Sequence, residues 1–123
     1  MTALATVTRQ GLANLLQATH RTVHEVTPRV PVPPCLVVQP DVGWITPSRL
    51  GSLDRFELRL KILIVERDNA DGLAGIEDAV EEIFEVIATT CQVNEITPPM
   101  PLDVGAQGTV LVSEIKLSIQ VKE

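Results

Sequence analysis

The chain has 123 residues, of which 45% are hydrophobic but only 2% are aromatic, and its formal net charge is −6. This length fits one domain, residues 1–123, which can bury an aliphatic core of its own. Ten lysines and arginines are scattered among sixteen aspartates and glutamates. The composition argues against the concentrated basic surface of a sequence-specific DNA reader, and the scarcity of aromatics argues against a stacking platform for single strands.

No part of the sequence indicates secretion or membrane insertion. The N-terminal residues lack a basic region followed by a long apolar one, and no apolar run approaches the ~18 residues of a spanning helix. Cys35 and Cys91 lie among apolar or small neighbours, which is typical of buried thiols in a reducing compartment rather than of a disulfide. We expect a soluble protein made inside the cell, with no membrane partner.

The first part of the chain predicts a helix followed by extended, proline-rich segments. Leucines and valines recur at helical spacing over residues 2–19, which predicts an amphipathic helix. Five prolines between residues 28 and 40 exclude helix there, so residues 22–27 and 35–39 are short strand candidates, and prolines near strand ends favour an edge position. Residues 43–54 carry Trp44 and are punctuated by Gly and Pro, which predicts a hairpin-like excursion or a mobile loop.

The segment RFELRLKILIVERDNADG, residues 55–72, predicts the clearest strand, followed by a turn. Its odd-numbered positions are charged up to Lys61, and then Leu63 and Val65 are apolar. Its even-numbered positions are apolar from 56 to 64. Because side chains of a strand alternate between two faces, the even positions are expected to face the core of the chain. The second face is charged in its first part and apolar in its second part. The alternation does not determine what packs against this face.

The rest of the chain predicts a second helix and another long strand. Residues 73–90 combine an apolar stripe with an acidic opposite face, residues 91–96 predict a short strand, and residues 97–108, with three prolines, predict an irregular connection. Residues 109–123 alternate again. Together these elements predict an α+β fold, an antiparallel-rich sheet with two helices packed on one face. The second sheet face would then lack cover from the chain; it carries Glu57, Arg59, Lys61, Glu114 and Lys116.

The candidates for catalysis or metal binding are weak. His20 and His24 are four residues apart, as in helical metal-binding pairs, but the helix is expected to end near them and no Cys follows at ligand spacing. The acidic positions from Glu77 to Glu85 could supply paired carboxylates or ligands for a hard metal, although a solvated helix face explains them more simply. No nucleophile elbow or phosphate loop is present in the sequence. We expect a non-enzyme without cofactor or metal; a small metal-binding protein or enzyme using these residues is the lower-ranked alternative.

Two features exceed what a free monomer needs. One is the mixed second face of the 55–67 strand, and the other is the pair of proline-rich excursions. A sheet with one solvent-exposed face and surface loops explains both features. A subunit interface explains them as well, because its charges would fix the register and its apolar residues would be buried. The interface candidates are Arg59, Lys61, Leu63, Val65 and Trp44. The candidates for contact loops are Pro47, Arg49, Met100 and Leu102.

The order of these elements resembles a known family. An opening amphipathic helix, PPCLVVQP, a Trp-bearing loop, FELRLKILIVERDNADGL, an acidic helix and a last long strand are similar to the tail terminator proteins of long-tailed bacteriophages. These are also called tail completion or minor tail proteins. The similarity covers most of the chain and is a pattern of elements with a strand-to-helix junction, without a catalytic signature.

The resemblance implies a virion protein, assembled in the host cytoplasm, that forms a hexameric ring at the head-proximal end of the tail. The ring would end polymerisation of the tail tube protein, bind the head–tail connector protein and let double-stranded DNA pass without specific binding. The strands 56–67 and 109–122 would form the sheet, helix 73–90 would cover it, and the loop around Trp44 would be a contact element. A head–tail connector, stopper or head-completion protein is the alternative, because proteins of that kind share parts of the pattern.

Overall fold

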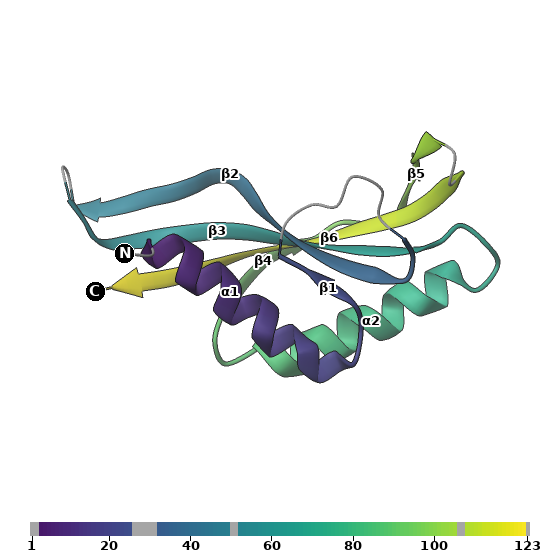
Figure 1. The fold of residues 1–123 in the computed structure, drawn as a ribbon, viewed down its shortest axis with the longest axis horizontal. Helices are drawn as coiled ribbons and strands as arrows, with labels where there is room; N and C mark the ends of the chain where they lie inside the picture. Colours follow the sequence, from purple (N-terminus) through teal and green to yellow (C-terminus); the bar gives the residue numbers. More distant parts are fainter. Residues whose placement is uncertain (1–2, 26–31, 50–51, 106–107, 123) are drawn as a thin grey trace.

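The computed structural model describes residues 3–25, 32–49, 52–105 and 108–122, without the side chains of residues 48–49 and 52–54 (Figure 1). In these ranges two α-helices and a mostly antiparallel six-stranded sheet form an α+β fold, which confirms the predicted fold class. Figure 1 shows both helices on the same side of the sheet. The helices are α1 (Leu4–Leu16), which continues as a 3-10 turn η1 (Gln17–Thr19), and α2 (Gly72–Ile87).

The sheet is built around two long strands that run side by side. Its order is β1-β2-β3-β6-β4, and β5 pairs with another part of β6. Only the pairing of β1 with β2 is parallel among the described pairings. The strands are β1 (Val23–His24), β2 (Cys35–Arg49), β3 (Ser52–Arg67), β4 (Gln92–Ile96), β5 (Met100–Asp103) and β6 (Thr109–Lys122).

The main core lies between the helices and one face of the sheet, which we call the first face. The even-numbered side chains of β3 from Phe56 to Ile64 are at most 3% exposed, and Ile115 and Leu117 of β6 lie beside them. The helices contribute a buried stripe each to the same cluster. The predicted assignment of the even positions of β3 to the core is therefore confirmed. The helix residues buried there are Leu12, Ala13, Leu16, Ile76, Ala79, Ile83 and Ile87.

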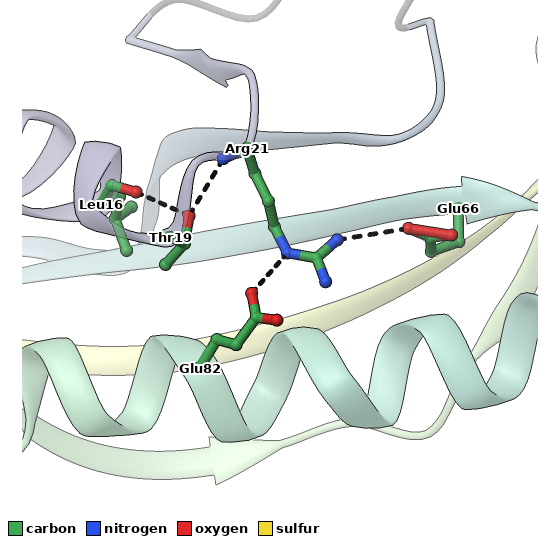
Figure 2. A network of polar contacts seen from close by, with 5 residues as sticks. All are labelled: Leu16, Thr19, Arg21, Glu66 and Glu82. Carbon is green, nitrogen blue, oxygen red and sulfur yellow. Dashed lines mark hydrogen bonds and ion pairs between the residues drawn. The ribbon is translucent and has the colours of Figure 1, made fainter.

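Arg21 ties the end of the first helical segment to both α2 and β3 (Figure 2). Its Nε donates a hydrogen bond to Glu82 Oε2 at 3.0 Å, and its Nη1 lies 3.5 Å from Glu66 Oε1. Its backbone N–H faces Thr19 Oγ1 at 3.4 Å, and the Thr19 hydroxyl donates to the Leu16 carbonyl at 2.7 Å. The Arg21 and Glu66 side chains are both mostly buried, so their pair is less screened than a surface pair, whereas Glu82 is more exposed; together the two pairs link the start of the chain to α2 and β3.

The segment predicted as an excursion around Trp44 is a strand over most of its length. β2 continues to Arg49 and forms an antiparallel hairpin with β3, so the loop alternative is wrong; the hairpin turn itself lies outside the described residues. The register shifts between Pro40 and Ile45, which pair with Leu60 and Leu58, so the chain bulges between them. Among the described residues, β1 pairs only with Leu36 and Val37, so no described strand other than β3 lies beside Pro40 and Pro47 of β2, and proline suits an edge where no ladder donor is needed.

Two further predictions need correction. The connection over residues 97–108 is not wholly irregular, because β5 lies within it and pairs with the start of β6. Pro101 is compatible with this strand because β5 is an edge strand. The strand candidate at residues 22–27 is reduced to Val23–His24, and residues 26–27 lie outside the described ranges. The predicted short strand at 91–96 is confirmed as β4.

Candidate subunit interface

The second face of the sheet, formed by odd-numbered residues of β3 and even-numbered residues of β6, is charged in its middle part. Lys61 and Lys116 lie directly opposite each other across the β3–β6 ladder, where like charges repel. Lys61 Nζ lies 3.2 Å from Glu114 Oε2, and Lys116 Nζ lies 3.7 Å from Glu95 Oε2. The predicted contact residue Lys61 is therefore already paired within its own chain. Such partly exposed pairs fix side-chain positions more than they stabilise the fold.

The apolar part of the second face is covered by the chain itself. Cys35, Val37, Val65 and Val110 form a second buried cluster, against which Leu63 and other partly buried side chains pack. Val65 is only 2% exposed, so the prediction that it contacts a neighbouring subunit is wrong. The physical reason is its register, because Val65 lies between Cys35 of β2 and Val112 of β6 and all three side chains are apolar or small.

A hollow on the second face brings together residues that the sequence predicted separately. Leu63 of β3 lines a pocket of about 370 Å³ together with Met100 and Leu102 of β5, and Glu114 lies at the same pocket. Met100 and Leu102 are 62% and 49% exposed, whereas Leu63 is half-buried. The structure therefore joins three of the predicted contact residues in one apolar surface, although β5 is a strand and not a loop.

The remaining predicted contact residues lie on the β2–β3 hairpin, which reaches the end of the sheet opposite β5 (Figure 1). Trp44 is 46% exposed beside the β2 bulge, and Pro47 is exposed further along the strand. Arg59 is exposed on β3, with its Nε 3.5 Å from Glu57 Oε1. The Arg49 side chain lies outside the described residues. The predicted interface thus divides into a hairpin region and the Met100–Leu102 region.

Sequence reasoning missed a third surface, which runs along α2. The apolar stripe predicted there contains Leu73, Val80 and Phe84, but Leu73 is 54% and Phe84 41% exposed, and Val80 is only partly buried. These side chains line two adjoining hollows, one of about 600 Å³ that extends to the Ile96–Pro99 segment and one of about 550 Å³ that extends to Ala88. We call this surface the α2 groove. The signal in the sequence was the width of the stripe, which exceeds what one core contact can bury.

The two histidines lie in different elements, and both thiols are at least partly buried. His20 follows η1 with a left-handed φ of 59° and His24 lies in β1, so they do not share a helix. Burial and then Glu66 raise the pKa of the Cys35 thiol, and burial raises the pKa of Cys91 to about 11. Both cysteines are free and stay protonated at neutral pH, which disfavours nucleophilic attack. Within the described ranges, no group of three or more His, Cys, Asp or Glu side chains is placed to hold a metal ion.

The described helices and the comparisons with known proteins add two findings. Among the described residues, no helix combines the length and the apolar character needed to cross a membrane. No protein-family model and no curated protein matches the chain. Function is therefore inferred from the exposed surfaces, namely the α2 groove, the Met100–Leu102 region and the hairpin.

Proposed function

We propose that this protein is a structural subunit of a bacteriophage tail, a tail terminator that assembles into a ring on the end of the tail tube. One observation carries the proposal: exposed apolar side chains gather in two parts of one small chain, along the α2 groove with the neighbouring Met100–Leu102 region, and at Trp44 on the β2–β3 hairpin. Exposed apolar patches mark protein contacts, and a cyclic ring needs two different surfaces on every subunit. The α+β fold and the order of its elements agree with the resemblance to tail terminators.

The charge of the chain suits a ring through which duplex DNA passes. Each subunit carries a formal net charge of −6. Repeated around a ring, this charge repels phosphates that come within the ~8 Å screening length at physiological salt. A lumen of this kind would let DNA slide without binding it. The ring would stop further growth of the tail tube. The upper surface of the ring would then be presented to the head connector.

The oligomeric state tests the proposal most directly. We expect light scattering after size exclusion, and negative-stain images, to show a ring of about six subunits, either in solution or after purified tail tubes are added. A protein that stays strictly monomeric and also fails to cap tubes would sink the proposal. Deletion of the gene in a phage that carries it separates the alternative: loss of a terminator gives overlong or unstable tails, whereas loss of a connector or stopper gives heads that leak DNA.

A further inference from the structure

The edges of the sheet are poor places for subunits to join. Strand addition needs a row of free backbone N–H groups, and proline has none. The open edge of β2 contains Pro40 and Pro47 and is interrupted by the bulge before Ile45. On the other side of the sheet, β5 contains Pro101, and Pro98 and Pro99 lie in the connection between β4 and β5. Subunits are therefore expected to meet through side-chain surfaces and not by extending the sheet.

The α2 groove has an apolar floor and a strongly acidic rim. Glu77, Glu81 and Glu85 line the same hollows as Val80 and Phe84, and all three glutamates are exposed. The sequence of α2 contains five acidic residues and no lysine or arginine. Within the described part of the chain, only Glu82 of these five forms an ion pair, with Arg21. The rim is thus three carboxylates without a cationic partner among the described side chains, beside apolar side chains that remain exposed.

The complementary surface on the same chain lies on the half of the second face that is nearer the β2–β3 hairpin. Arg55 and Lys122 are directly opposite each other on the second face, and both are exposed. Arg59 lies four residues further along the same face, beside the β2 bulge, where a Cβ added to Gly43 would lie 3.5 Å from Arg59 Cδ. The bulge also carries Trp44, exposed as described above, and we call this surface the hairpin end. Arg59 also pairs with Glu57 of its own chain, so Arg55 and Lys122 are the cations without a partner among the described side chains. Together with the exposed tryptophan they complement the carboxylates and apolar side chains of the α2 groove.

We propose that the α2 groove of one subunit receives the hairpin end of a second copy of this chain. Trp44 would enter the apolar groove near Phe84, and Arg55, Arg59 and Lys122 would face the glutamates of the rim; buried aromatic anchors with surrounding charge pairs are common at protein interfaces. Figure 1 shows that the β2–β3 hairpin reaches one end of the molecule, whereas α2 lies beneath the middle of the sheet and extends towards the other end. One subunit can therefore offer both surfaces at once, which is the head-to-tail contact that closes a ring. This inference rests on the proposed ring and names its contact.

A charge exchange tests the pairing. One variant carries Glu77→Lys, Glu81→Lys and Glu85→Lys, and the other carries Arg55→Glu, Arg59→Glu and Lys122→Glu. Each variant alone has two surfaces of like sign and is expected to lose the ring, with at least a ~10-fold weaker self-association, since each tenfold corresponds to only ~1.4 kcal/mol. An equimolar mixture restores complementary contacts in alternation, so it is expected to recover rings of even subunit number. Circular dichroism and thermal melting check that each variant is folded.

The control and the outcomes separate this pairing from ring formation itself. Asp68→Lys with Asp78→Lys reverses two exposed acidic residues that do not line the α2 groove, and it is expected to leave the ring intact. If wild-type rings form and both triple variants still form them, or if the mixture stays monomeric, the pairing is overturned and the ring stands. If the wild type forms no ring in solution or on tubes, the ring proposal fails. Should a triple variant fail to fold, Phe84→Ala and Trp44→Ala test the same contact, and rings of wild-type strength in both would overturn it.

Discussion

The side chains of β3 alternate regularly between its two faces, but the two faces are covered differently. On the first face, every even-numbered side chain from Phe56 to Ile64 is buried beneath the helices. On the second face, Arg55 and Arg59 are exposed, Lys61 and Leu63 are half-buried, and Val65 is buried by neighbouring strands. Periodicity therefore identifies which residues share a face. What covers a face depends on elements that come from elsewhere in the chain.

The largest expected effect separates the two faces at adjacent residues. Leu60→Asp places an unpaired charge in the main core, where Leu60 is 1% exposed. The cost in free energy of folding is expected to exceed about 5 kcal/mol, which is comparable with the stability of a whole domain, so the variant is expected not to fold. Lys61→Asp loses the pair with Glu114 and is expected to cost about 1 kcal/mol or less. Urea unfolding followed by circular dichroism measures both.

The same pair of variants also tests the placement of the interface. If Lys61→Asp unfolds the protein as badly as Leu60→Asp, the assignment of the two faces is wrong. If Lys61→Asp stays folded and loses the ring while the α2 rim variant keeps it, the second face is the contact surface and the α2 groove is not.

The cover of the first face depends on a close approach where β3 turns into α2. A Cβ on Gly72 would collide with the Arg67 carbonyl and would lie 2.7 Å from Leu111 Cδ1. Gly72→Ala is therefore expected to lower the free energy of unfolding by about 3 kcal/mol, because backbone cannot move aside as a flexible side chain can. Gly11→Ala is the matched control, since nothing lies within 4 Å of the added Cβ, and it should stabilise α1 by about 0.5–1 kcal/mol. Equal effects of the two variants in thermal melts would contradict the close packing at Gly72.

The buried part of the second face predicts a smaller difference between Val65 and Leu63. Val65→Ala removes two methyl groups from a closed cluster and is expected to cost about 2 kcal/mol. Leu63→Ala removes more atoms, but Leu63 is half-buried beside an open hollow and is already partly solvated. This substitution is therefore expected to lower the free energy of unfolding by less than Val65→Ala does. Chemical denaturation of both variants gives the order. A larger loss of free energy of unfolding for Leu63→Ala would show that Leu63 belongs to the closed cluster.

Much of the fold could be predicted because its strongest signals are local. The alternation of β3 and β6 and the helical stripes of α1 and α2 depend on residues a few positions apart, and these elements were found with small boundary errors. For residues 43–49 the sequence left a hairpin-like excursion and a loop open, and β5 was missed, because glycines and prolines argue against regular strands. Proline is tolerated there because both strands offer an open edge, and edge status depends on the sheet order and not on local sequence.

The candidate interface was harder to predict because it depends on contacts far apart in the sequence. Val65 looked like a surface residue from its strand alone, and only its neighbours on β2 and β6 bury it. Leu73 and Phe84 looked like core residues from their helix alone, yet the rotation of α2 on the sheet leaves them exposed. Both errors have one cause: a periodic pattern shows that a residue is apolar and on a given face, but the docking of whole elements decides its burial.

The two thiols sharpen the comparison of the faces with the smallest expected effect. Cys35 lies in the second-face cluster and Cys91 packs against the main core. For Cys91 the folded pKa of about 11 lies above the ordinary value of 9.0, so the native state holds its proton more tightly. The raised pKa of Cys91 stabilises the folded state fully below pH 9, and this stabilisation is lost as the pH rises towards 11. The loss in free energy of unfolding is at most about 2 kcal/mol, because each pKa unit corresponds to ~1.4 kcal/mol and the thiol is partly solvated.

Denaturant titrations of the wild type and Cys91→Ala between pH 8 and 11 measure this loss. The free energy of unfolding is plotted against pH for each protein, and the difference between the two slopes isolates the single thiol from other groups that titrate in this range. Labelling with a disulfide reagent at pH 8 gives the complementary reading: Cys91, which is half-buried, should react before the buried Cys35, and both should react far more slowly than in the unfolded chain. Fast labelling of Cys35 in the native protein would show that the second-face cluster opens readily. In that case the second face would be closed only loosely around Val65, and the contrast with the helix-covered first face would become stronger.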